Sequence, residues 1–247
     1  MGIGMVLGPG MAGWLANISL SFPFFLASGL STIALLLVWA ILPESLPVEQ
    51  RFSSNSKTRG PQLGKMWEAL NGPIGFLFVI GFLLSFGLTN FESIFGLFAL
   101  NRFGYGPSQV GMLLTIIGLI SAVAQGGLTG PVTRRWGESR VIKVALLTSA
   151  IGFPLMLTAN SYATILLTTG FFVLSNSMLT PAVSSLISKR ASSGHGITLG
   201  LNNSFMSLGR SIGPLTAGFL FDLNNSLPYI TGGLVMLLGF INSMWKL

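Results

Sequence analysis

The sequence has no cysteine, and its 247 residues include a single histidine, His195. The lack of cysteine excludes disulfides, thiolate nucleophiles and iron–sulfur centres, and one histidine cannot build a histidine-rich metal site. The chain also contains no GxxxxGK(S/T) motif, no dinucleotide-binding glycine fingerprint and no HExxH motif. We therefore expect a protein that is not an enzyme and that binds no cofactor and no metal ion.

Charged residues are also scarce. They make up 8% of the chain, whereas 51% of the residues are hydrophobic and the mean hydropathy is +0.74. Soluble domains carry about 25% charged residues. The composition therefore predicts an all-α polytopic membrane protein surrounded by the lipid bilayer. The net charge of +7 does not indicate nucleic-acid binding, because the basic residues lie mainly in loops between apolar runs.

Apolar runs of about 20 residues, enough to cross roughly 30 Å of hydrocarbon, recur along the chain. Seven of them have full length: 22–42, 73–99, 108–130, 141–158, 162–187, 196–221 and 227–244. The opening segment, residues 1–16, would form a helix of only about 24 Å. We interpret it as an eighth span that lacks its first turns.

The basic residues lie almost entirely on one side of the predicted membrane. Arg102 falls in a loop on the opposite side, and Arg210 falls inside a span. All the others share one side: Arg51, Lys57, Arg59, Lys65, Arg134, Arg135, Arg140, Lys143, Lys189, Arg190 and Lys246. Because basic loops face the cytoplasm, the pattern predicts a multi-pass protein of the cell membrane with both termini in the cytoplasm.

The pattern GxxxGPxxxG occurs twice, as GMVLGPGMAG and as GRSIGPLTAG. Its fixed positions are Gly4, Gly8, Pro9 and Gly13 in the first copy, and Gly209, Gly213, Pro214 and Gly218 in the second. In an apolar helix, such small residues let a neighbouring backbone approach closely, and the Gly-Pro step bends the helix or frees a carbonyl. Two copies predict two equivalent half-bundles.

One long polar loop divides the chain. Residues 43–72 are predicted to form a cytoplasmic linker, with 63–70 as a short helix along the inner membrane surface. Residues 1–42 are then the last two helices of an incomplete N-terminal half-bundle, and residues 73–247 form a C-terminal six-helix bundle. If the two glycine motifs are equivalent, four helices should precede the first copy, and these missing N-terminal helices are a candidate partner.

Two charged residues, Glu92 and Arg210, lie well inside predicted spans, where an isolated charge costs about 2.5 to 3.5 kcal/mol. Glu92 shares a helical stripe with Ser85, Thr89 and Gly96, which we expect to face a cavity. Removal from water favours the protonated carboxyl, which suits a group that exchanges a proton for a cationic substrate. The alternative is a structural carboxyl that hydrogen-bonds between helices.

Arg210 is a candidate charge partner of Glu92, although their predicted depths differ by about 7 Å. Backbone carbonyls near Pro214, or a group on the missing helices, are the alternatives. The candidate residues of a substrate pathway are Phe86, Asn90, Phe95, Gln125, Asn176, Asn203 and Ser207. Interhelical hydrogen bonding is the alternative for the polar members, and packing is the alternative for the phenylalanines.

These motifs resemble the major facilitator superfamily, and within it the drug:proton antiporters of the multidrug and tetracycline efflux type. GMVLGPGMAG is similar to the antiporter signature of that family's fifth helix, LGLNNSFMSLGRSIGPLTAGFLFD to its counterpart in the eleventh, and LPESLP to the end of the sixth. The FES at 91–93 resembles a seventh-helix position whose acid is implicated in proton coupling. The resemblance covers helices five to twelve of a twelve-helix protein.

The chain departs from the family at two positions. The gate motif between the eighth and ninth helices reads GxLaDRxGRR, and GPVTRRWGESR matches it at Gly130, Arg135 and Gly137. Arg134 occupies the aspartate position, so the carboxylate expected to pair across the cytoplasmic gate is replaced. Ser177 stands where members can carry a tenth-helix acid, which leaves Glu92 as the membrane acid of this half.

The resemblance implies a proton-coupled secondary transporter that exports lipophilic, cationic drugs by alternating access and so confers antibiotic resistance. It implies a small-molecule substrate and protons as partners, and no nucleic acid. Two alternatives remain open, namely a metabolite transporter of the same fold and a truncated membrane remnant that does not transport.

Overall fold

The computed structural model describes residues 2–43, 63–190 and 195–247. Over these ranges the chain forms helices and no strand, which confirms the all-α prediction. The helices are α1 (Gly2–Ala16), α2 (Phe22–Ile41), α4 (Leu63–Leu70), α5 (Gly75–Phe103), α6 (Pro107–Val123), the π-helical turn η1 (Ala124–Leu128), α7 (Thr129–Trp136), α8 (Glu138–Met156), α9 (Tyr162–Arg190), α10 (His195–Leu223) and α11 (Leu227–Lys246).

Six helical segments among the described residues are long and apolar enough to cross a membrane. They are α2, α5, the continuous stretch Pro107–Trp136, α8, α9 and α11. The chain is therefore a multi-pass membrane protein. Val6–Ala16 is a shorter apolar helix.

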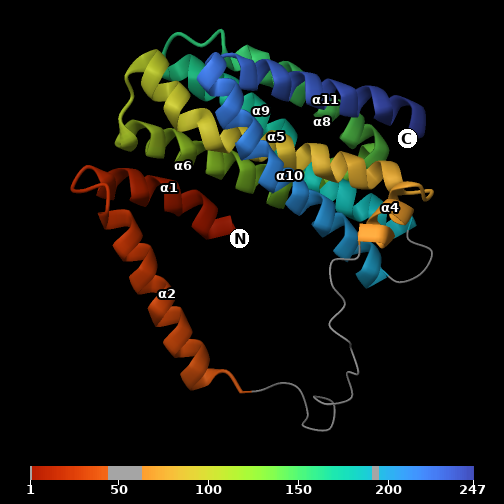
Figure 1. The fold of residues 1–247 in the computed structure, drawn as a ribbon, viewed down its shortest axis with the longest axis horizontal. Coiled ribbons are helices and arrows are strands. Elements are labelled where there is room, and N and C mark those ends of the chain that lie inside the picture. The colour runs from red at the N-terminus through yellow and green to blue at the C-terminus, as the bar shows by residue number, and fades with distance from the viewer. Residues whose placement is uncertain (1, 44–62, 191–194) are drawn as a thin grey trace.

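Helix α10 differs from the prediction. The sequence predicted a full span at 196–221, and the helix is 29 residues long, yet it is not among the six apolar segments. Asparagine, serine and arginine side chains on one face, including Asn203, Ser207 and Arg210, lower its hydropathy. It nevertheless runs alongside α5 within the bundle (Figure 1).

The bundle is built around α5, which contacts α9, α10 and α11 and is buried over much of its length. Its core contains an aromatic chain from three helices. The ring of Phe172 in α9 lies 5.4 Å from that of Phe91 in α5 and 4.4 Å from that of Phe153 in α8, centroid to centroid. All three side chains are buried, so they join α5, α8 and α9 into one apolar core.

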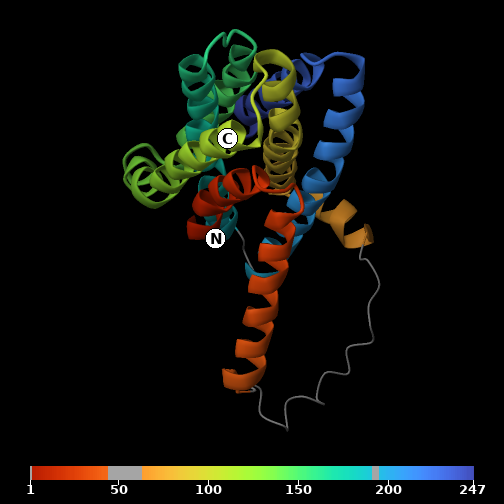
Figure 2. The same cartoon turned by 90° about the vertical axis from the view of Figure 1, so that its left-hand side faces the viewer.

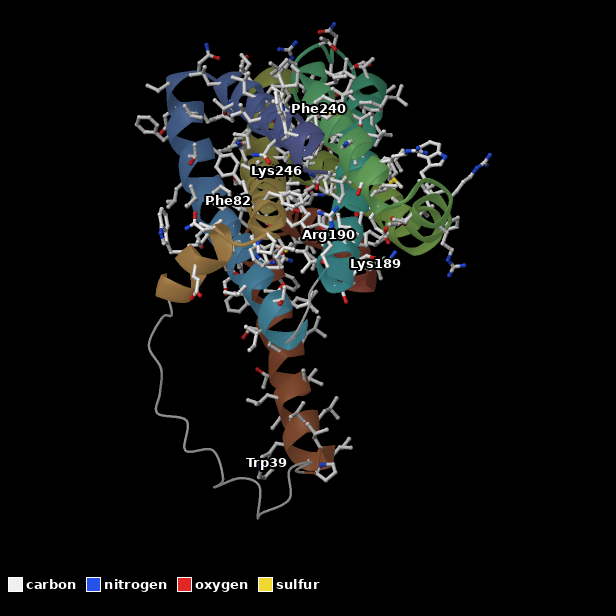
Figure 3. The ribbon with its side chains drawn as sticks, turned by 90° about the vertical axis from the view of Figure 1, so that its right-hand side faces the viewer. Trp39, Phe82, Lys189, Arg190, Phe240 and Lys246 are labelled. Atoms are coloured by element: carbon white, nitrogen blue, oxygen red, sulfur yellow. The ribbon has the colours of Figure 1, made fainter. Side chains whose placement is uncertain are left out.

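The two N-terminal helices take different positions. Helix α1 lies along α6, whereas α2 projects away from the bundle and has no buried residue (Figures 1 and 2). Figure 3 shows Trp39 near the outer end of α2, far from Lys189 and Arg190 at the end of α9. Among the described residues, this part of the chain is therefore joined to the rest mainly through the contact between α1 and α6.

The predicted linker is described only in part. Helix α4 has the bounds Leu63–Leu70 that the sequence predicted for a short helix. Residues 44–62 of the polar loop, with Arg51, Lys57, Arg59 and most of LPESLP, lie outside the described residues.

The first Gly-Pro motif lies at a close contact between α1 and α6. A Cβ atom added to Gly13 would lie 2.6 Å from the Pro107 carbonyl oxygen and 2.9 Å from Gly111 Cα. A Cβ atom on Gly111 would in turn lie 2.6 Å from the Pro9 carbonyl oxygen. Any side chain at either glycine would force the two backbones apart.

The second motif brings α10 equally close to α5, but through different positions. A Cβ atom on Gly213 would lie 2.8 Å from the Phe86 carbonyl oxygen, and one on Gly209 would lie 2.9 Å from the Phe86 nitrogen. Cβ atoms at the remaining motif glycines, Gly4, Gly8 and Gly218, would meet no atom of the described chain within 4 Å. The two copies therefore make their close contacts on different faces.

Candidate functional site

A cavity of about 450 Å³ lies between α1, α5, α6 and α9. Each helix presents one face to it, with lining residues at helical spacing. They are Gly4 and Pro9 from α1; Leu88, Phe91 and Glu92 from α5; Leu114, Ile117, Gly118, Ser121 and Gln125 from α6 and η1; and Val173, Asn176, Ser177 and Thr180 from α9. The lining is mainly apolar with a few polar groups, as is typical of small-molecule sites.

Glu92 is the only ionisable residue among the described residues that line the cavity. Its side chain is exposed to this space, beside Leu88 and Phe91 of the same helix. A carboxylate facing a cavity with apolar walls interacts with a cation far more strongly than it would in water. The site therefore has the chemistry to bind either a proton or a cationic group.

The wall formed by α6 and α9 carries a small hydrogen-bond network. Ser177 donates from Oγ to Ser121 Oγ over 2.8 Å, and Gln125 donates from Nε2 to the same oxygen over 2.9 Å. Next to them, the Asn176 side chain is only 2% exposed, and its Nδ2 has no hydrogen-bond partner among the described residues. This wall therefore has polar groups that are not fully satisfied by the protein.

Helix α6 changes its winding beside this network. Residues Ala124–Leu128 form a π-helical turn, and Thr129 Oγ1 donates to the Ala124 carbonyl oxygen, five residues back, over 2.7 Å. Such single π turns occur often at functional sites, since they shift the side chains that follow. Gln125 lies within this turn and reaches both the cavity and Ser121.

The family model for the Major Facilitator Superfamily matches residues 77–247, about two thirds of the chain. The chain belongs to this superfamily. This confirms the resemblance read from the motifs, and it identifies a transporter family rather than an enzyme.

Curated relatives extend the match to the N-terminal helices. The chain is 34% identical over 245 residues to Multidrug resistance protein 2 of Bacillus subtilis (strain 168), a match that covers 98% of this chain and 61% of the relative. It is 31% identical over 245 residues to Multidrug resistance protein 1 of the same organism, with the same coverage. It is 30% identical over 226 residues to Quinolone resistance protein NorA of Staphylococcus aureus (strain Mu50 / ATCC 700699), covering 91% of this chain and 57% of that protein. The chain thus spans about three fifths of the length of these relatives.

The fold also matches a solved structure. The crystal structure of the human organic anion transporter MFSD10 (TETRAN) superposes with a TM-score of 0.64 at 24% sequence identity. The match covers 91% of this chain and 57% of that protein. It supports a major facilitator fold, of which this chain supplies the part described above.

In this facilitator chain, the cavity gathers Glu92 and two of the pathway candidates, Gln125 and Asn176, together with Gly4 and Pro9 of the first Gly-Pro motif. Three other pathway candidates lie in helix interfaces instead. Phe86 and Phe95 are buried, and Asn90 donates from Nδ2 to the Pro228 carbonyl oxygen over 3.4 Å. The physical reason is the central place of α5, which packs against several neighbours and offers the cavity only one narrow face.

Asn203 and Ser207, the last two candidates, lie on a separate open groove. Its other lining residues are Met66, Ser204, Leu208 and Ser211 from α4 and α10. The predicted stripe around Glu92 is also divided, since Thr89 donates to the Ser85 carbonyl oxygen and lies against Gly213 of α10. Glu92 therefore lies between the face of α5 that packs against α10 and the face of α5 that lines the cavity.

The structure does not bring Glu92 and Arg210 together. Arg210 is exposed and donates from Nη2 to Ser207 Oγ, one turn away, over 3.1 Å. Within the described ranges, the ion pair formed is the one between Lys189 and Glu138. The close contact of α10 with α5 through Gly209 and Gly213 leaves the neighbouring Arg210 on the outside.

Sequence reasoning missed Ser121 as a cavity residue and considered Ser177 only as a departure from the family. A signal was present, because Ser121 and Gln125 are four residues apart and so share one helix face. Pairing that face with Ser177 on α9 required the tertiary contact between α6 and α9.

The gate motif residues lie at the junction of α7 and α8. Arg134 and Arg135 are exposed in the last turn of α7, and Gly137 has a φ of 78°, a left-handed conformation that favours glycine. Glu138, which follows it, pairs with Lys189 at the end of α9 and accepts a hydrogen bond from Ser185 Oγ over 3.0 Å. A carboxylate is therefore present beside this loop, four residues after the position where the family motif has aspartate.

Proposed function

We propose that the chain forms part of a proton-coupled secondary transporter that exports lipophilic, cationic drugs across the cell membrane by alternating access. The observation that carries the proposal is the single carboxyl group, Glu92, in a mainly apolar cavity. The relatives named as multidrug and quinolone resistance proteins support drugs as the substrate class.

Glu92 would couple the two ligands because they compete for one carboxylate. Ionised Glu92 attracts a cation in surroundings where the Coulomb energy is several times larger than in water. Protonated Glu92 has no charge, so the cation loses this attraction and leaves. A proton gradient across the membrane then drives the cation out, provided that the cavity opens to the two sides in turn.

The two Gly-Pro helices support a rocking motion between half-bundles. We assign residues 1–42 to the end of the N-terminal half-bundle, 43–72 to the linker and 73–247 to the C-terminal half-bundle. The contact between Gly13 and Gly111 then lies at the interface of the halves. Close, smooth backbone contacts of this kind allow helices to move against one another without interlocking side chains.

We place the chain in the cell membrane with both termini in the cytoplasm. Lys189 and Arg190 lie in the last turn of α9, and Lys246 lies in the last turn of α11 (Figure 3). Basic residues at these ends support a cytoplasmic position by the positive-inside rule. On this assignment, the junction of α7 and α8, with Gly130, Arg135 and Gly137, belongs to the cytoplasmic gate.

The proposal is tested by ethidium efflux driven by a pH gradient in proteoliposomes. The wild-type chain should extrude ethidium, and Glu92→Gln should lose this flux while inserting into the membrane in the same amount. Glu68→Gln, which neutralises an exposed carboxyl of α4 outside the cavity, is the matched control and should retain gradient-dependent flux. Equal flux in wild type and Glu92→Gln would refute the coupling role.

A further inference from the structure

We infer that the wall opposite Glu92 is a second subsite, which binds a neutral hydrogen-bond acceptor of the substrate, such as a carbonyl oxygen, through Asn176 and Ser121. The inference rests on the proposed function, because it assigns a further chemical feature to the molecules that this cavity would carry. On this inference, α5 binds the positive charge of the substrate, and donors on α6 and α9 bind its hydrogen-bond acceptor.

Asn176 supplies the first donor. It lines the cavity, its side chain is 2% exposed, and its Nδ2 has no partner in the part of the chain that the structure describes. An unpaired amide N–H in the membrane interior is costly, so a ligand oxygen that accepts from it would be bound favourably. The χ2 angle of asparagine is broad, so the amide group can rotate at low cost to meet a ligand oxygen.

Ser121 supplies the second donor. Its Oγ accepts hydrogen bonds from both Ser177 and Gln125, which occupies the two acceptor positions of the hydroxyl. The hydroxyl proton of Ser121 is then free to donate, and Ser121 itself lines the cavity. The hydrogen bonds from Ser177 and Gln125 hold this group in place on the wall.

The other side chains of this wall do not favour the binding of a second cation. Its cavity residues from α6, η1 and α9 include no acidic side chain. Donors without a nearby carboxylate favour a neutral oxygen or nitrogen acceptor on the ligand. The preferred ligand is therefore a lipophilic cation that also carries an acceptor, with its charge toward α5 and its acceptor toward Asn176.

The experiment compares two probes that differ by one carbonyl group. Tetraphenylphosphonium has no acceptor, and (4-acetylphenyl)triphenylphosphonium has the same charge with an added acetyl group. Binding of each to the chain in lipid nanodiscs is measured by isothermal titration calorimetry. The wild type should bind the acetyl probe about fivefold more tightly, the effect of one net hydrogen bond.

Asn176→Ala should remove this preference while leaving tetraphenylphosphonium binding within about twofold, which also shows that the variant is folded. Ser121→Ala should reduce the preference in the same way. Asn202→Ala is the matched control, because Asn202 is also 2% exposed with an unpaired amide atom but does not line the cavity. It should keep the full preference.

The outcomes separate this inference from the function on which it rests. Equal affinity of the wild type for the two probes, or a preference that survives Asn176→Ala, overturns the acceptor subsite alone. If neither cation binds to the wild type, or if Glu92→Gln binds both cations as tightly as the wild type does, the cation site is overturned and the inference with it. If Glu92→Gln binds both probes more weakly and Asn176→Ala loses the preference for the acetyl probe, the cation site and the acceptor subsite are both supported.

Discussion

Gly13 of α1 and Gly111 of α6 meet where the two helices touch, each placed so that a Cβ atom on it would lie 2.9 Å from the other's Cα. A methyl group at either position cannot be accommodated by a rotamer change, because the atoms it meets belong to the backbone. This contact holds α1 close beside α6, and Gly4 and Pro9 of the same helix line the candidate cavity.

The first prediction concerns this contact. Gly13→Ala should destabilise the chain by about 1 to 3 kcal/mol, the usual cost of forcing extra volume into a packed contact. The effect is measured as the loss of thermal stability in detergent. Gly8→Ala is the control in the same helix, since a Cβ there meets no atom of the described chain within 4 Å, and it should change the melting temperature little. Equal effects of the two substitutions would contradict the close contact.

The second prediction concerns the ion pair beside the gate loop. Lys189 is largely exposed, so its pair with Glu138 should contribute less than about 1 kcal/mol to stability. The pair joins the first turn of α8 to the last turn of α9, so reversing one charge would place two like charges side by side between these helices. Reversing either charge should therefore lower transport, and the double reversal Glu138→Lys with Lys189→Glu should restore most of it. Ethidium efflux from vesicles measures this, and a double reversal no better than either single change would argue against the pair.

The third prediction concerns Glu92 and Arg210. Since Arg210 donates to Ser207 and does not contact Glu92, the losses caused by Glu92→Gln and Arg210→Ala should be independent. A double-mutant cycle on the affinity for tetraphenylphosphonium should give a coupling energy below about 0.5 kcal/mol. A coupling of 1 kcal/mol or more would mean that the two charges interact after all.

Much of this fold could be predicted from the sequence. The apolar runs gave helix positions to within a few residues, and 63–70 matched α4. Helix α10 was the exception, because the polar side chains on its face away from α5 lower its hydropathy below that of the other predicted spans. The length of an apolar run predicts a membrane span well. It does not show which neighbouring helices cover the polar face of that span.

The cavity was harder to predict than the helices. Glu92 was identifiable because a carboxyl inside a span is costly. Phe86, Phe95 and Asn90 lie in helix interfaces and not in this cavity, because α5 packs against several helices, which its periodicity does not reveal. The pairing of Ser121 with Ser177 could not be predicted, because it depends on the contact between α6 and α9, where the two Oγ atoms lie 2.8 Å apart.

The central claim is that Glu92 exchanges a proton for a cation, and proton release on binding tests it most directly. The chain is placed in lipid nanodiscs in a weakly buffered solution, at a pH where Glu92 is protonated. Tetraphenylphosphonium is then added, and an indicator dye measures the protons that are released. Proton release should saturate together with cation binding, and it should disappear in Glu92→Gln but not in Glu138→Gln. Saturable cation binding without proton release from the wild type would contradict it.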